Sequence, residues 1–186
     1  MRIVAGQFKG RPIQAPKTDA TRPTSDRTRE SLFNILAHAE WAPALDGARV
    51  LDLFAGSGAL GLESLSRGAQ FCLFVDTAHA ARGAIRNNIE ALGLFGVTRI
   101  HRRSAAALGE KPAGLGARFD VAFLDPPYHK GLVAPCLKTL RSEGWLVENA
   151  LVIVETAADE NIDLTGWELV LDRNAGAAKI WFLKAA

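Results

Sequence analysis

The 186-residue chain is predicted to form an α/β fold, in which helices cover both faces of a mostly parallel sheet. Short apolar segments alternate with helical segments along most of the chain, and such alternation places successive strands parallel to one another. A glycine-rich turn joins the first strand of this alternating region to the helix that follows it. Because 48% of the residues are hydrophobic, we expect one substantial core and a single domain over residues 1–186.

The N-terminal part is predicted to be a basic arm that precedes the main body. Gly6, Gly10 and Pro12 indicate a short β-hairpin over residues 1–16, and a loop follows over residues 17–23. The arm and its loop together span residues 1–23.

The body spans residues 24–186 and begins with a helix that is capped near Thr24 or Ser25. Five strands and three helices then alternate. We expect the strands near residues 49–54, 71–76, 97–101, 119–124 and 150–155, and the helices near 58–68, 78–92 and 130–142. The chain closes with two further strands, near 167–172 and 178–183, which a loop over residues 173–177 connects.

The first strand and its glycine turn have the features of a ligand site. Gly56 and Gly58 let the backbone approach a ligand closely, and the first N–H groups of the next helix point into the same space. Asp52, inside the first strand, suits a ligand with a positively charged amino group. Asp76 ends the second strand, where a carboxylate is well placed to accept both hydroxyls of a ribose.

A dinucleotide-binding enzyme is an alternative, because Gly56, Gly58 and Gly61 also fit the pattern G-x-G-x-x-G. Asp52 argues against this alternative, since dinucleotide folds usually carry apolar residues just before the glycines. The chain is also short for an additional substrate domain. The glycine motif alone leaves the two interpretations equal.

A later apolar run ends in the sequence Asp125-Pro126-Pro127-Tyr128. The prolines fix φ and have no N–H, so the turn is stiff and its carbonyls stay free to accept hydrogen bonds. A carboxylate and a carbonyl beside an aromatic ring suit a planar group with an NH2, such as a nucleobase. A plain strand-ending turn is the simpler interpretation, but the turn and the glycine motif together favour methyl transfer.

The two motifs resemble motif I and motif IV of the S-adenosylmethionine-dependent amino-methyltransferases. The segments Met1–Arg11, Thr21–Arg27 and Leu32–Leu36 narrow the resemblance to the bacterial RsmD family, which methylates N2 of one guanine in 16S ribosomal RNA. The similarity extends over nearly the whole chain. It implies a Rossmann-like class I methyltransferase fold, with a seven-stranded sheet whose last strand is antiparallel.

The resemblance also implies the roles of individual residues. The expected catalytic residues are Asp125, Pro126 and Tyr128. The expected site for the cofactor S-adenosylmethionine consists of Asp52, Phe54, Ala55, Gly56, Ser57, Gly58, Asp76 and Ser104. Two of these depart from the family, since many relatives have Glu in place of Asp76 and an acid or amide in place of Ser104. The expected partner is 16S rRNA, in a 30S subunit or an assembly intermediate.

Two other functions remain open. Methylation of adenine N6 or of a protein glutamine uses a related Pro-Pro-aromatic turn, although those enzymes usually have Asn in place of Asp125. A catalytically silent RNA-binding module would not require both motifs to be intact.

The charge distribution indicates where RNA would bind. Residues 1–30 hold seven basic and three acidic side chains, a net charge of +4, whereas the remainder holds 15 basic and 17 acidic ones. A basic N-terminal segment on a slightly acidic body favours the binding of a polyanion such as RNA. We expect RNA contacts from Lys9, Arg11, Arg22 and Arg27. The alternative is that Arg22 and Arg27 pair with nearby acids and only fix the loop.

Other classes of protein are disfavoured. The two cysteines, Cys72 and Cys136, form neither a disulfide framework nor a metal-binding spacing, and we expect no metal. No apolar run approaches the roughly 18 residues that span a bilayer, and the N-terminus has no secretory signal. We therefore expect a cytoplasmic protein without a membrane partner.

Overall fold

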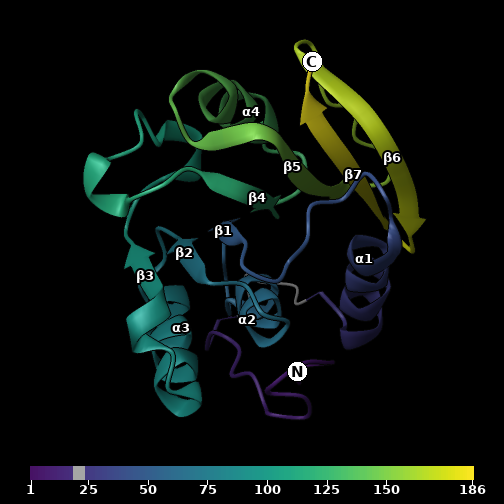
Figure 1. The fold of residues 1–186 in the computed structure, drawn as a ribbon. Coiled ribbons are helices and arrows are strands. Elements are labelled where there is room, and N and C mark those ends of the chain that lie inside the picture. Colours follow the sequence, from purple (N-terminus) through teal and green to yellow (C-terminus); the bar gives the residue numbers. More distant parts are fainter. Residues whose placement is uncertain (19–23) are drawn as a thin grey trace.

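The computed structural model describes residues 1–18 and 24–186 and contains one seven-stranded sheet with helices on both faces (Figure 1). Its strands are β1 (Arg49–Leu53), β2 (Phe71–Val75), β3 (Thr98–His101), β4 (Phe119–Leu124), β5 (Leu146–Ala157), β6 (Trp167–Ala175) and β7 (Ala178–Ala185). The strand order is β3-β2-β1-β4-β5-β7-β6. Strands β1 to β5 pair in parallel, and β7 is antiparallel to both of its neighbours. The predicted fold class, with an antiparallel last strand, is confirmed.

The helices form two layers. They are α1 (Asp26–His38), α2 (Ala59–Ser66), α3 (His79–Leu92) and α4 (Val133–Ser142), with single 3₁₀ turns at Phe95–Val97, Ala105–Ala107 and Ala113–Leu115. Figure 1 shows α1, α2 and α3 on one side of the sheet and α4 on the other. The first helix has the expected cap, because Ser25 Oγ accepts a hydrogen bond from Thr28 N at 3.1 Å.

The central strands β1, β2 and β4 are buried on both faces, and each face has its own hydrophobic cluster. In β4, Val121 and Phe123 belong to the cluster under α1, α2 and α3, whereas Ala122 and Leu124 belong to the cluster under α4. Burial on both faces explains why these strands are nearly continuous apolar runs in the sequence.

The C-terminal hairpin differs from the prediction. The loop expected over residues 173–177 is instead mostly strand, because β6 continues to Ala175, which pairs with Ala178. The connection is therefore only a tight turn, in which Gly176 has φ +62°. β5 is also longer than predicted, since it begins at Leu146 beside Phe119 and continues through Ala157, which pairs with Ala178.

The predicted N-terminal hairpin is present in reduced form, as a single antiparallel bridge between Arg2 and Pro12. Its apolar residues Ile3 and Ile13 are 1% and 4% exposed and belong to the cluster under α1, α2 and α3. Gly6 lies so close to α2 that a Cβ there would stand 2.0 Å from the Ser66 carbonyl oxygen. The arm thus packs tightly on the body.

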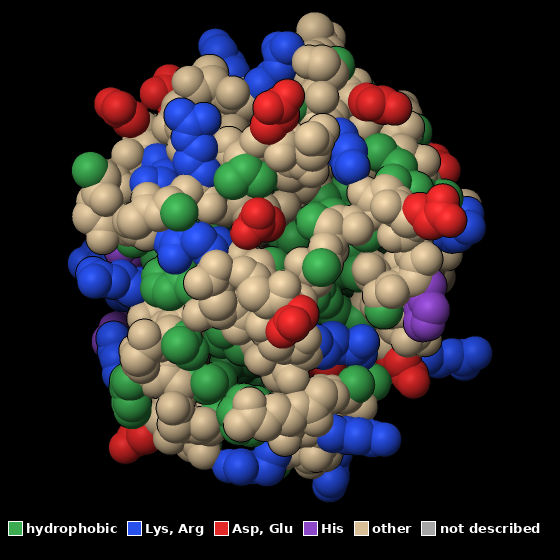
Figure 2. Space-filling view, in the orientation of Figure 1, with side chains coloured by type: hydrophobic (Ala, Val, Ile, Leu, Met, Phe, Trp, Pro, Cys, Tyr) green, Lys and Arg blue, Asp and Glu red, His purple; other side chains and the backbone are tan. Residues whose placement is uncertain are grey.

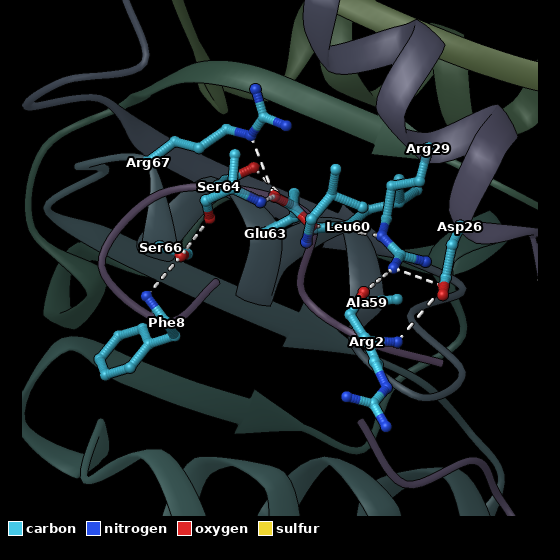
Figure 3. Close-up of polar contacts among 12 residues, drawn as sticks. Arg2, Phe8, Asp26, Arg29, Ala59, Leu60, Glu63, Ser64, Ser66 and Arg67 are labelled. Carbon is cyan, nitrogen blue, oxygen red and sulfur yellow. Dashed lines mark hydrogen bonds and ion pairs between the residues drawn. The ribbon is translucent and has the colours of Figure 1, made fainter. Parts of the chain in front are cut away.

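A cluster of charged residues around the buried Glu63 and Arg29, which we call the Glu63 cluster, fastens the arm to α1 and α2 (Figure 3). Glu63 is fully buried and accepts hydrogen bonds from Val4 N at 2.8 Å and Ala5 N at 3.1 Å. It also pairs with Arg29 Nε at 3.4 Å and Arg67 Nε at 3.0 Å. A terminal nitrogen of Arg29, Nη2, donates to the Arg2 carbonyl and to Asp26. The cluster therefore consists of Arg2, Asp26, Arg29, Glu63 and Arg67.

Candidate active site

The carboxyl ends of neighbouring parallel strands define the candidate site. Leu53 at the end of β1 pairs with the last residue of β2 on one side and of β4 on the other, and β5 continues this register. The residues that follow this row, in sheet order, are Asp76, Phe54, Asp125 and Glu155. All four line a cavity of about 820 Å³. A cavity at this edge, next to β1, is where α/β sheets bind ligands.

The glycine turn forms one wall of this cavity. Gly56 and Gly58 have φ of +59° and +80°, a region that favours glycine, and α2 begins directly after them at Ala59. Phe54 also has a positive φ, +57°, which is strained for a residue with a side chain. Of the cofactor residues predicted from the sequence, only Gly58 does not line the cavity; its N–H donates to Ala55 O at 2.7 Å and closes the turn.

Asp76 both shapes this turn and faces the cavity. Its Oδ2 accepts a hydrogen bond from Gly56 N at 2.9 Å, and its Oδ1 accepts one from Ala78 N at 2.9 Å. Each carboxylate oxygen can accept a second hydrogen bond. The geometry therefore leaves one acceptor position per oxygen for a pair of hydroxyl groups.

Asp52 is a buried carboxyl group in the cavity wall, 1% exposed. Burial raises its pKa to about 8; the hydrogen bond from Gly61 N, at 3.0 Å, opposes this rise, and the charge of Asp76 adds to it. Among the described residues, no Lys or Arg forms an ion pair with Asp52. A cationic ligand group is thus the missing partner that would favour its charged form. This chemistry fits the ammonium group of S-adenosylmethionine.

The end of β3 supplies the remaining predicted cofactor residue. Ser104 is exposed, lines the cavity beside Arg103 and Ala105, and stands at the start of a 3₁₀ turn. Its side chain makes no capping hydrogen bond there, so its hydroxyl group is available to a ligand.

The Asp125-Pro126-Pro127-Tyr128 turn follows the neighbouring strand β4 and lines the same cavity. Pro126 is buried, and Asp125 and Tyr128 are half-buried. Burial raises the pKa of Asp125 well above its ordinary value, and the neighbouring carboxyl group of Glu155 raises it further. The cofactor and acceptor motifs, 70 residues apart in the sequence, thus share one cavity.

Glu155 is a site residue that the sequence analysis missed. Its Oε1 accepts a hydrogen bond from the Tyr128 hydroxyl at 2.8 Å, and its Oε2 accepts one from Thr24 Oγ1 at 3.3 Å. The signal was available, because an acid follows the apolar run 151–154 just as Asp76 and Asp125 follow theirs.

The N-terminal arm also reaches the site. Asn88 on α3 is buried and donates from Nδ2 to the Gln14 carbonyl and to the Ser57 carbonyl, both at 3.0 Å. The next arm residues, Ala15 and Pro16, line the cavity. Asn88 therefore holds the arm and the glycine turn in a fixed relation.

Three of the four predicted RNA-binding residues lie in the described part of the chain, and all three are exposed. Lys9, Arg11 and Arg27 are exposed, and Arg11 Nη2 donates to Ala91 O at 2.7 Å, while Arg22 lies outside the described residues. In the described part of the chain, Arg27 forms no ion pair, and Asp26 pairs instead with Arg29 at 2.8 Å. Figure 2 shows basic side chains along the lower edge of the molecule, over the N-terminal segment.

Neither a metal site nor a membrane span is found over residues 1–18 and 24–186. No group of three or more His, Cys, Asp or Glu side chains there could hold a metal ion. Likewise, no helix in these ranges has the length and apolar character needed to cross a bilayer.

The strand order, the glycine turn and the two acidic strand ends define a class I methyltransferase. The chain belongs to the family described as Conserved hypothetical protein 95, the RsmD family, which matches residues 1–184.

Named relatives agree with this assignment. Ribosomal RNA small subunit methyltransferase D of Escherichia coli is 34% identical over 178 residues, which cover 95% of this chain and 85% of the relative. YlbH of Bacillus subtilis, named as a candidate rRNA methyltransferase, is 35% identical over 173 residues, which cover 93% of this chain and 91% of the relative. The solved structure of the Escherichia coli protein yhhF, a candidate methyltransferase, has a TM-score of 0.83 and 34% identity and covers 100% of this chain and 97% of that one.

Proposed function

We propose that the protein transfers a methyl group from S-adenosylmethionine to the exocyclic N2 of a guanine in 16S rRNA. The observation that carries the proposal is the shared cavity, which both the Asp125–Tyr128 turn and the glycine turn line. Relatives that are named small-subunit rRNA methyltransferases support the substrate class. The Asp-Pro-Pro-Tyr turn, with Asp rather than Asn, supports N2 of guanine as the acceptor atom.

Different cofactor residues would bind different parts of S-adenosylmethionine. Asp52 would hold the ammonium group, the N–H groups that follow the Phe54–Gly58 turn would bind the carboxylate, and Asp76 would accept the ribose hydroxyls. Ser104, at the end of β3, would contact the adenine. When bound, S-adenosylmethionine supplies an electrophilic methyl group on a sulfonium sulfur.

The Asp125–Tyr128 turn would activate the acceptor. The lone pair of the guanine amino group is delocalised into the ring, so the neutral NH2 is a weak nucleophile. Hydrogen bonds from NH2 to an Asp125 oxygen and to the Pro126 carbonyl pull the nitrogen toward a tetrahedral geometry. The Tyr128 ring stacks on the base, which has left its own stack. Positioning and electrostatics therefore supply the rate.

The nitrogen loses one proton as the new N–C bond forms. The carboxyl groups of Asp125 and Glu155, both on the cavity wall, would accept it. Burial and the proximity of Glu155 raise the pKa of Asp125, and a raised pKa gives this pair a higher affinity for the released proton.

Ribosomal RNA would reach the site across the basic arm. Lys9, Arg11, Arg22 and Arg27 are the proposed phosphate contacts. The substrate would be 16S rRNA within a 30S subunit or an assembly intermediate, and the enzyme would act in the cytoplasm. Residues 1–186 would work as one domain, since the arm lines the cavity that the body forms.

The direct test uses labelled S-adenosylmethionine and small ribosomal subunits that lack the modification. Incubation should label one guanine of 16S rRNA, at N2, which nuclease mapping and mass spectrometry of the labelled nucleoside would identify. Label in adenine, or in a ribosomal protein, would overturn the proposal. An Asp125→Ala protein serves as the control for contaminating activity.

A further inference from the structure

Glu155 stands beside the proposed acceptor turn for a structural reason. In the parallel pair of β4 and β5, Leu124 lies opposite Val154, so the next residues, Asp125 and Glu155, are also neighbours. Both carboxyl groups line the same cavity, and the proximity of Glu155 raises the pKa of Asp125. Two acceptor groups are thus held side by side at the place where the acceptor base would enter.

The Glu155 side chain is held in one orientation. The Tyr128 hydroxyl donates to its Oε1 at 2.8 Å, and the Thr24 hydroxyl donates to its Oε2 at 3.3 Å. A carboxylate has about four acceptor positions. The Thr24 and Tyr128 hydroxyl groups occupy two of them, one on each oxygen, so each oxygen keeps an acceptor position for a ligand donor.

Guanine and adenine differ in what they present beside the exocyclic amine. In guanine, the atom next to the N2 amino group is N1–H, a donor, so the edge presents two adjacent donors. In adenine, the atom next to the N6 amino group is N1 with a lone pair, an acceptor. Two adjacent carboxyl groups therefore match the guanine edge, whereas the adenine edge would place its N1 lone pair against a carboxylate.

We propose, resting on the proposed function, that Glu155 selects guanine by accepting the hydrogen of N1–H while Asp125 and Pro126 hold the adjacent amino group. Glu155 is in this view a specificity residue. The Tyr128 hydroxyl couples the two tasks, because the same hydrogen bond that orients Glu155 also fixes the ring that stacks on the base.

The test compares two acceptor bases that share the N2 amine. 2-Aminopurine has the same amino group as guanine, but its N1 carries a lone pair and no hydrogen, and it lacks O6. The change of the ratio in Glu155→Gln therefore isolates the contribution of N1–H from that of O6. Small ribosomal subunits would be reconstituted with 16S rRNA that carries either base at the mapped acceptor position. The measured quantity is the ratio of the single-turnover rate constants for guanine and 2-aminopurine, determined for each enzyme.

Wild-type enzyme should favour guanine by at least about 100-fold, because 2-aminopurine leaves the carboxylate facing a lone pair. Glu155→Gln should reduce this ratio to about tenfold or less, since the Gln amide can donate to N1 of 2-aminopurine. Glu148→Gln, on the same strand but exposed, should keep the wild-type ratio. Affinity for S-adenosylhomocysteine checks that each variant is folded.

The outcomes separate the two proposals. If wild type methylates guanine and 2-aminopurine equally well, or if Glu155→Gln keeps the wild-type ratio, Glu155 does not read N1–H and the inference is overturned while the proposed function stands. If wild type methylates neither base, the proposed function fails and the inference fails with it. The wild-type comparison needs no variant, so it can overturn the inference even if Glu155→Gln does not fold.

Discussion

Two groups of acidic side chains, the Glu63 cluster and the carboxyl groups of the cavity, differ in whether they have partners of opposite charge. In the Glu63 cluster, one buried carboxylate has four donors: two backbone N–H groups and the guanidinium groups of Arg29 and Arg67. At the cavity, Asp125 and Glu155 face each other, and no Lys or Arg in the described part of the chain pairs with Asp52, Asp125 or Glu155.

The difference separates a structural from a functional use of buried charge. A carboxylate with a complete set of donors is stable in the folded protein, but removal of one partner leaves an uncompensated charge. Carboxyl groups that burial and like charge disfavour, as at Asp52 and Asp125, are costly to the free protein. They are stabilised when a ligand brings the missing cation or donor, and such groups concentrate at active sites.

The largest predicted effect falls on the Glu63 cluster. Glu63→Ala should lower the free energy of unfolding by about 3–5 kcal/mol, because Arg29 would remain buried without its carboxylate. Denaturant titration measures this change. Glu148→Ala, an exposed residue, should stay within about 0.5 kcal/mol of wild type. Equal stability of the two variants would show that the cluster does not hold the arm.

The second-largest effect is expected on the rate of methyl transfer, from substitutions in the Asp125–Tyr128 turn. Asp125→Ala should lower kcat by a factor of about 100 or more while the affinity for S-adenosylmethionine stays near wild type, because its hydrogen bond strengthens in the transition state. Tyr128→Ala should weaken acceptor binding by about 1–3 kcal/mol through lost stacking. Asp159→Ala, which loses only an exposed contact to His129, is the control. Single-turnover rates that match wild type would remove the turn from the mechanism.

The third effect concerns proton linkage at Asp52. With a pKa of about 8, Asp52 is protonated at neutral pH in the free protein, and a bound ammonium group favours its carboxylate. Binding therefore releases a proton below about pH 8, so affinity for S-adenosylhomocysteine should rise by up to about tenfold per pH unit between about pH 6 and pH 8. Calorimetry in buffers of different ionisation enthalpy measures the released proton.

The Asp52→Asn variant separates this linkage from other titrations, since its affinity for S-adenosylhomocysteine should be low and nearly independent of pH over the same range.

The effect of Asp52→Asn on the free energy of unfolding should be opposite to that of Glu63→Ala. The folded pKa of Asp52 lies above the unfolded value of about 3.9, so wild-type stability falls as pH rises from about 4 to about 8. Asn cannot ionise and avoids that loss. A destabilised Asp52→Asn protein at about pH 8 would contradict this account.

Much of the fold and part of the site follow from local sequence. Alternating apolar segments predicted the strands, and the glycine turn and the Asp125–Tyr128 turn each marked a strand end in the cavity wall. These strands and turns can be predicted from the sequence because each depends on residues that are consecutive in the chain. Their meeting in one cavity follows from parallel strands, whose carboxyl ends share one edge of the sheet.

The unpredicted parts depend on contacts between distant segments. Glu155 reaches Asp125 only because β5 lies next to β4 in matching register, which no local pattern specifies. Glu63 looks like an ordinary polar residue in a helix, and its burial depends on Arg29 and on an arm that begins about 60 residues earlier in the sequence. The length of β6 was missed because pairing with β7 extends it through the polar residues Arg173 and Asn174.

The smallest effect per residue is expected on the outer surface of the arm, where charges are exposed and screened. Changing Lys9, Arg11 and Arg27 together to Gln should weaken 16S rRNA binding, because each lost phosphate contact lowers the slope of log affinity against log salt by somewhat under one unit. The matched control changes three exposed basic residues, Arg118, which precedes β4, and Lys138 and Arg141 in α4. Figure 1 shows α4 on the opposite face of the sheet from α1, α2 and α3, against which the arm packs. Filter binding across a salt series measures both slopes. A folded arm variant whose slope equals that of the control would contradict this prediction. In that case the arm has only a structural role, as its contacts with Glu63 indicate, and RNA binds elsewhere.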